Sequence, residues 1–316
     1  LGSLPDSATA NLVEFRVTDL TDAVETSPTY TIQVDGTAPG SPQNLVAEPS
    51  TWTGVNAFAL HWTNPAQSLA PISRAYYKLS SAPTSSSDYS GYREDANIAQ
   101  ITGISLSASG AIPCYVWLGD AAGNADYATA VSTTLYYAGD SAPEPPIQMQ
   151  LSPGSWTATN QFTATWINPS TPSGIRAAWY KWGAPPTHND DADGYVAGKD
   201  IHTLTGLTAP AEGDTNLYVW LEDGAGRHDY TKRSMVTAYY DGTPPQTTYS
   251  FTPPLPAGGW YSGTVTVNLT AQDALSGVQV TRWRQDNQLL WRDGTSITAS
   301  SYITYGFKSL DNAGNE

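Results

Sequence analysis

The four histidines of this chain could do the most varied chemistry, and they are widely scattered: His61, His188, His202 and His228. None stands at a spacing that would bring two imidazoles to one metal ion, and none lies near a serine in the setting of an activated nucleophile. No phosphate-cradling glycine loop leads from a strand into a helix. We therefore expect no catalytic residues and no enzymatic activity.

The densest acidic stretch is HNDDADG, residues 188–194. Closely spaced carboxylates before a glycine can surround a hard cation with oxygen ligands, which makes Asp190, Asp191 and Asp193 candidate Ca²⁺ ligands. The stretch lacks the spacing of an EF-hand and its closing glutamate, and a solvated acidic loop would explain the same residues. Apart from Ca²⁺, no cofactor is expected.

The run at 114–118 alternates between core-like and aromatic residues. Since successive side chains of a strand point to opposite sides, Tyr115 and Trp117 are expected to face away from the core. The same phase turns Tyr218 and Trp220 outward in a related run. An exposed aromatic patch usually marks a contact surface for protein or sugar. Cross-strand aromatic pairs, or packing beneath a loop, would instead only stabilise the sheet.

Charge and cysteine content restrict the possible partners. The chain carries 14 basic and 29 acidic residues, a net charge of −15, which repels phosphate backbones and argues against nucleic acid. The single cysteine, Cys114, allows no internal disulfide and is expected to be a small buried hydrophobe. The uncharged stretch 96–119 is interrupted by polar residues, glycine and proline, so no membrane insertion is expected.

Self-similarity at a long period is the strongest feature of the sequence. Trp52, Trp156 and Trp260 recur at a constant interval of 104 residues (156 − 52 and 260 − 156). CYVWLGDAAGN (114–124) returns as LYVWLEDGAGR (217–227), and a looser YGFKSLDNAGN closes the chain at 305–315. Further matches link the first two copies, where Phe58, Trp62, Asn64 and Pro65 recur as Phe162, Trp166, Asn168 and Pro169. So many positions in register indicate a tandem repeat.

Each copy shows the alternation of half-buried strands. The apolar residues alternate in three such runs: Phe58, Leu60 and Trp62; Ile147, Met149 and Leu151; Val265, Val267 and Leu269. Roughly seven such runs per hundred residues, separated by turn signals, predict antiparallel β-sandwiches.

Three proline-containing segments mark the joints between copies: VDGTAPGSP (34–42), AGDSAPEPP (138–146) and YDGTPP (240–245). Proline stiffens such joints, which predicts an extended rod. We expect the closing strands of a truncated domain in 1–37, complete domains in 38–141 and 142–244, and a domain lacking its C-terminal strand in 245–316.

Two further possibilities concern these joints and ends. The joint aspartates Asp35, Asp140 and Asp241 could bridge Ca²⁺ between neighbours, although turn formation explains them without metal. The amino-terminal strands of one chain could also complete the last domain of another, as in strand donation.

Several short motifs resemble those of a known class of domain. These are the D-x-A-G-N turns at 120–124 and 311–315, the D-x-x-S-G-V run at 273–278 and the D-G-T-P-P exit at 241–245. Together they look like bacterial Ig-like repeats, which are similar in architecture to fibronectin type III modules. The resemblance implies an all-β fold of tandem Ig-like sandwiches in a large secreted or cell-surface protein, and it identifies no ligand. The second copy departs from the turn motif at Gly224 and Arg227.

The sequence therefore favours a non-catalytic structural segment of a bacterial extracellular or surface protein, such as a stalk, adhesin or filament subunit. Its expected partners are other copies of itself or neighbouring Ig-like domains, reached through aromatic sheet faces. The alternative is a glycan-binding array attached to a secreted enzyme, in which an exposed tryptophan would line a sugar-sized platform. A contact between chains would bury the same tryptophan.

Overall fold

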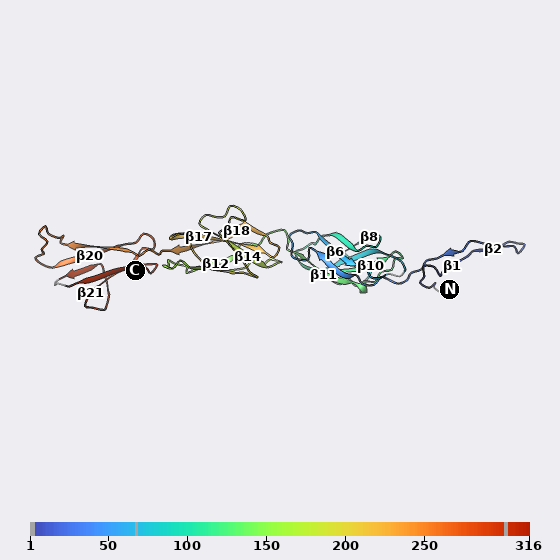
Figure 1. The fold of residues 1–316 in the computed structure, drawn as a ribbon, viewed down its shortest axis with the longest axis horizontal. Helices are drawn as coiled ribbons and strands as arrows, with labels where there is room; N and C mark the ends of the chain where they lie inside the picture. Colours follow the sequence, from blue (N-terminus) through green and yellow to red (C-terminus); the bar gives the residue numbers. More distant parts are fainter. Residues whose placement is uncertain (1–3, 67–68, 300–302) are drawn as a thin grey trace. The chain divides into compact units, whose positions relative to one another are not determined.

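The computed structural model describes residues 4–66, 69–299 and 303–316, and antiparallel strands dominate it (Figure 1). It divides into two compact units: residues 1–141 with 171–173, and residues 142–170 with 174–316. Within the described residues the only helical segment is the short 3₁₀ turn Tyr127–Thr129. The predicted all-β fold of Ig-like sandwiches is confirmed.

The first sandwich lies in the first unit and joins a three-stranded sheet to a four-stranded one. The smaller sheet has the order β5–β6–β9, formed by Gln43–Glu48, Phe58–Thr63 and Gln100–Ile104. The larger sheet has the order β11–β10–β7–β8, formed by Val131–Tyr137, Gly110–Asp120, Ile72–Leu79 and Gly91–Glu94. Ahead of it, β1 (Leu12–Val13) pairs with β4 (Tyr30–Thr31), and β2 (Arg16–Thr18) with β3 (Val24–Thr26).

The second sandwich repeats this topology in the second unit. Its smaller sheet, β12–β13–β16, is formed by Ile147–Ser152, Phe162–Ile167 and Thr203–Leu207. Its larger sheet, β15–β14–β17–β18, is formed by Gly194–Ala197, Ile175–Trp182, Gly213–Asp223 and His228–Tyr240. The sequence repeat is therefore a repeat of strand order.

The third sandwich, also in the second unit, has two described sheets of three strands each. One has the order β19–β20–β23, from Gln246–Thr252, Val265–Gln272 and Ser296–Ala299. The other has the order β22–β21–β24, from Arg292–Asp293, Val278–Gln285 and Tyr305–Asp311. Each sandwich lies inside one predicted domain range, while the boundaries themselves stay predictions.

The cores contain the residues that alternation selects. Phe58 and Leu60 on β6, and Phe162 on β13, are almost completely buried. The repeated Trp–Asn pairs follow from packing, because a buried indole needs a partner for its N–H group. Asn64 Oδ1 accepts from Trp62 Nε1 at 2.8 Å, and Asn168 Oδ1 accepts from Trp166 Nε1 at 2.8 Å.

The tryptophan that defines the 104-residue period packs against the last strand of its sandwich. Trp52 contacts Tyr136 with ring centroids 5.3 Å apart, and Trp156 contacts Tyr239 at 5.5 Å. The third copy differs, because Trp260 is 87% exposed. The repeated tryptophan thus packs against the last strand in two sandwiches and is exposed at the surface of the third.

Candidate functional site

The four-stranded sheet of the second sandwich carries an aromatic layer on the face opposite its core. Trp220 of β17 is 0% exposed but does not belong to the core cluster. It stacks on Trp179 of β14, with centroids 6.4 Å apart and ring planes at 15°. Tyr195 of β15 packs on Trp179 at 4.6 Å and is 43% exposed. The layer thus runs from a buried tryptophan to a surface tyrosine.

The first sandwich has the same layer built from other residues. Trp117 of β10 is 0% exposed and stacks on Tyr76 of β7 at 5.3 Å and 10°. Tyr89 and Tyr92 pack against Tyr76 at 5.3 and 5.9 Å, and they are 39% and 42% exposed. Two copies therefore place a buried tryptophan beneath partly exposed tyrosines.

The predicted exposure of Trp117 and Trp220 is wrong, although the predicted phase is right. Both side chains point away from the main cores, as alternation requires, but both are 0% exposed, with Tyr76 stacked on Trp117 and Trp179 stacked on Trp220. The other two predicted contact residues, Tyr115 and Tyr218, are half-buried. The partly exposed Tyr89, Tyr92 and Tyr195 were missed, because a single strand pattern does not show which aromatic residue lies on top.

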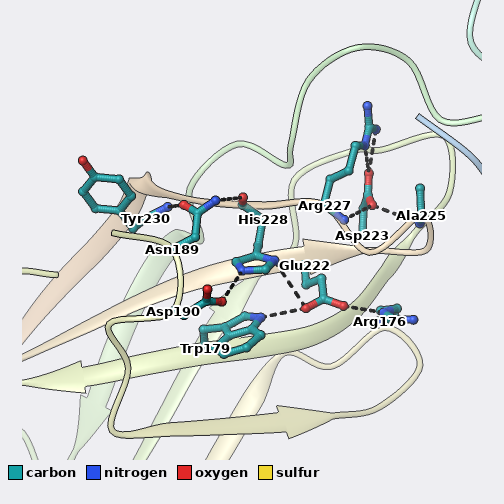
Figure 2. Close-up of polar contacts among 10 residues, drawn as sticks. All are labelled: Arg176, Trp179, Asn189, Asp190, Glu222, Asp223, Ala225, Arg227, His228 and Tyr230. Carbon is teal, nitrogen blue, oxygen red and sulfur yellow. Dashed lines mark hydrogen bonds and ion pairs between the residues drawn. The ribbon is translucent and has the colours of Figure 1, made fainter. Parts of the chain in front are cut away.

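A buried carboxylate connects the aromatic layer of the second sandwich to charged groups (Figure 2). The side chain of Glu222 is 4% exposed, and its Oε2 accepts a hydrogen bond from Trp179 Nε1 at 2.8 Å. Its Oε1 accepts from the Arg176 guanidinium, which raises the pKa of Arg176. The charge of Glu222 is thus paired and its oxygens are used within the sheet.

His228 completes this group from the start of β18. Its ring stacks on Trp179 at 4.6 Å and 16° (Figure 2). One ring nitrogen lies 3.6 Å from Glu222 Oε2 and the other 3.6 Å from Asp190 Oδ1. Asn189 Nδ2 donates to the His228 carbonyl at 3.0 Å, and Asn189 Oδ1 accepts from Tyr230 N at 3.1 Å. These contacts fasten the loop before β15 to β18.

The acidic loop predicted to bind Ca²⁺ uses its carboxylates for other contacts. Asp191 pairs with Lys181 and accepts two hydrogen bonds from Thr187, and the Lys181 contact is the main cause of its lowered pKa. Asp193 accepts from Trp182 N at 2.7 Å, and Asp190 lies beside His228. The three carboxylates do not converge, so this geometry does not support a shared cation at Asp190, Asp191 and Asp193.

The first sandwich has the equivalent loop, with an equivalent ion pair. Lys78 pairs with Asp88, and Thr84 donates to Asp88 from its backbone N and its hydroxyl, each at 3.0 Å. The Lys78 bond and then the Thr84 bonds lower the pKa of Asp88 to about 2. The loop is therefore fixed to β7 by a charge pair.

A different set of carboxylates does converge, in the second unit. Asp241, Asp273 and Asp311 each bring an oxygen within 4.8 Å of the others. Asp241 and Asp311 are 0% exposed, and Asp273 is half-buried. Within the residues the structure describes, this is the one group of three or more acidic, histidine or cysteine side chains so arranged.

The other joint aspartates have local partners. Asp35 Oδ2 accepts from Ala70 N at 2.8 Å, and the Asp35 carbonyl accepts from Asn124 Nδ2 at 2.8 Å. Asp140 accepts from the Tyr137 hydroxyl. Cys114 is fully buried, and burial raises the pKa of its thiol to about 12, so the thiol is not a ready nucleophile.

The chain was compared with protein families, curated proteins and solved structures. No family model matches the chain, and no curated protein matches it. Among solved structures, the chain is similar to the FN1–FN3 domains of chicken CNTN1, at 13% identity and a TM-score of 0.31. That similarity covers 72% of this chain and 77% of the other. In the described residues, no helix is long and apolar enough to cross a membrane.

The sheet topologies and cores define the class of the chain. It is a series of antiparallel β-sandwiches of the Ig-like kind.

Proposed function

We propose that this chain is a non-catalytic structural segment of a bacterial extracellular or cell-surface protein, such as a stalk, adhesin or filament subunit. In this proposal, the outer faces of the four-stranded sheets contact other copies or neighbouring Ig-like domains. Domains of this architecture are common outside cells, and the strong negative charge favours solubility there.

The observation that carries the proposal is a set of partly exposed tyrosines packed on the aromatic layers, two in the first sandwich and one in the second. Tyr89 and Tyr92 in the first sandwich, and Tyr195 in the second, rest on buried or half-buried rings that fix their orientation. Tyrosine is enriched in protein interfaces, and an ordered side chain loses little further entropy on binding. The half-buried Tyr115 and Tyr218 lie on the same faces.

Electron microscopy of the purified protein tests this proposal directly. We expect ordered filaments or lateral assemblies that disappear when Tyr89, Tyr92 and Tyr195 are all changed to serine. A Tyr127→Ser variant is the control, because Tyr127 is also exposed but belongs to the 3₁₀ turn. Isolated particles at every concentration would contradict self-assembly.

A second function, glycan binding, is favoured by one feature of the first sandwich. The Arg74 guanidinium, which pairs with Glu94, lies 5.1 Å from the Tyr92 ring, and Tyr92 packs against Tyr89, so an exposed aromatic pair adjoins a charged group. Sugar sites combine ring stacking with such groups. On a glycan array, a hit lost in Tyr92→Ser and kept in Tyr127→Ser would support this alternative; the absence of any hit would exclude it for the glycans on the array.

A further inference from the structure

We infer that Asp241, Asp273 and Asp311 form a binding site for one divalent cation of the size of Ca²⁺. One oxygen from each carboxylate lies within 4.8 Å of the other two. Calcium–oxygen bonds are about 2.3–2.6 Å long, so two ligands of one ion are at most about 5 Å apart. The three oxygens therefore already have the spacing of a shared ligand shell.

The hydrogen bonds of these carboxylates leave their charge uncompensated. Asp241 accepts from the backbone N–H groups of Thr243 at 3.1 Å and Ser276 at 3.0 Å. Asp311 accepts from the backbone and the side chain of Asn315, each at 2.8 Å. All these donors are neutral, and none of the ion pairs found among the described residues involves these three aspartates. Buried charges are normally paired or bound to metal.

A buried hydroxyl at the same place also lacks a partner. Ser276 is 8% exposed, and its Oγ is fully buried with no hydrogen-bond partner. Its backbone N–H donates to Asp241 Oδ2, and the next N–H, that of Gly277, donates to Asp273 Oδ1 at 2.6 Å. The backbone that carries this hydroxyl is thus held between two of the three carboxylates. A bound cation with its water would supply the missing partner.

The second sandwich shows how the equivalent turn is neutralised without an ion. Asp223 occupies the position of Asp311, and both turns close with a backbone bond from the aspartate to the residue four places on. That residue is Arg227 in the second sandwich and Asn315 in the third. Arg227 binds Asp223 Oδ2 through Nη2 at 2.7 Å and Nε at 3.1 Å. The second sandwich therefore supplies its own positive charge at this turn, whereas the third places two further carboxylates, those of Asp241 and Asp273, beside Asp311.

The donor set selects the class of cation. It offers only oxygen atoms, which suit hard ions such as Ca²⁺ and Mg²⁺, and no thiolate or imidazole for a softer metal. Ca²⁺ tolerates irregular geometry, whereas Mg²⁺ demands shorter bonds in a near-ideal octahedron. Three carboxylates brought together from separate parts of the chain suit the more tolerant ion, Ca²⁺.

Isothermal titration calorimetry of the chelator-treated chain with CaCl₂ tests the site. We expect one saturable site that Asp241→Asn abolishes. Asp190→Asn should keep it, because that change removes the same charge from an exposed aspartate that lies outside the cluster. Because Asp241→Asn could disturb folding, circular dichroism and a melting curve accompany each variant.

Asn315→Arg gives a second test that does not depend on removing a carboxylate. It copies Arg227 into the third sandwich, so we expect it to prevent Ca²⁺ binding and to raise the melting temperature in chelator. Unchanged Ca²⁺ binding in Asn315→Arg, or no saturable site in the wild-type chain, would overturn the inference. Either result would leave the proposed function, which rests on the tyrosine layers, unaffected.

Discussion

Several single residues in this chain depend on one or two specific neighbours, either to pair a buried charge or to leave room for a ring. Glu222 is buried on the outer face of a sheet, where Trp179 and the Arg176 guanidinium use its two oxygens. Gly194 lies directly under the ring of Tyr180, and Gly91 directly under that of Tyr77. Such contacts are specific enough to be tested by single substitutions.

Replacing Glu222 with alanine should destabilise the second sandwich. The change leaves the Trp179 N–H group without its acceptor, and an unsatisfied buried donor costs about 1–3 kcal/mol. Urea unfolding monitored by tryptophan fluorescence measures this loss. Glu144→Ala is the matched control and should cost less than about 1 kcal/mol, because that carboxylate is 69% exposed and pairs with Lys232 at the surface. Equal losses from both changes would contradict the assignment.

Replacing Gly194 with alanine should also be destabilising, for a steric reason. A β-carbon at this position would lie 2.3 Å from Cζ of Tyr180, so the ring must move. Overpacking of this kind costs about 1–3 kcal/mol. Gly198→Ala is the control, since the nearest atom to its β-carbon would be 3.6 Å away. The melting temperature of Gly194→Ala should be lower than that of Gly198→Ala. Equal values would show that the Tyr180 ring can move aside without loss of stability.

The ion pair of Asp88 should make stability depend on acid. Its pKa is lowered to about 2, mainly by Lys78, whereas an unfolded aspartate has a pKa of about 3.9. A lowered folded pKa means that the stabilisation is present above pH 4 and is lost as the pH falls toward 2. The difference in melting temperature between the wild type and Asp88→Asn should therefore shrink over that range. A constant difference would show that the pair contributes no pH-dependent stability.

At the scale of strands and loops, each four-stranded sheet is packed on both faces. Aliphatic residues and tyrosines fill the inner faces, and the layers around Trp117 and Trp220 cover the outer ones. The equivalent loops at 80–90 and 183–193 are held by lysine–aspartate pairs. The outer layer is therefore a second, smaller core.

This arrangement predicts losses of stability of very different size for two residues on the same face of β17. Trp220→Ala removes a fully buried ring and should cost about 3–5 kcal/mol. Tyr218→Ala should cost about 1 kcal/mol or less, because that ring is half-buried, with the Arg233 guanidinium 5.7 Å from its centroid. Urea unfolding compares the two directly. A small cost for Trp220→Ala would mean that the ring is not held as the structure shows.

Strand alternation predicted much of these elements but not their covering. The pattern in 114–118 gave the correct inward phase for Cys114, Val116 and Leu118, which are all 0% exposed. It could not show that Trp117 is buried as well, because that burial depends on Tyr76, which is 41 residues away in sequence (117 − 76). The alternation of residue types along a strand shows which face of the sheet a side chain lies on. Whether the side chain is buried depends on the residues that pack on that face.

At the scale of the whole chain, the sequence repeat predicted the series of sandwiches. It could not predict which residues that are distant in sequence come together in the fold. The 104-residue period gave tandem sandwiches, and the first two share one strand order. The acidic stretch at 188–194 was predicted as a Ca²⁺ site because its carboxylates are close together in sequence. In the structure these carboxylates contact different partners. Asp241, Asp273 and Asp311 are far apart in sequence and meet only through folding.

Sedimentation velocity over a wide concentration range tests the central claim, that the outer sheet faces are contact surfaces. The wild-type chain should sediment faster as its concentration rises. A variant with Tyr89, Tyr92 and Tyr195 changed to serine should sediment as one slow species throughout, with an unchanged circular dichroism spectrum. A wild-type sedimentation coefficient that does not depend on concentration would contradict self-association through these faces.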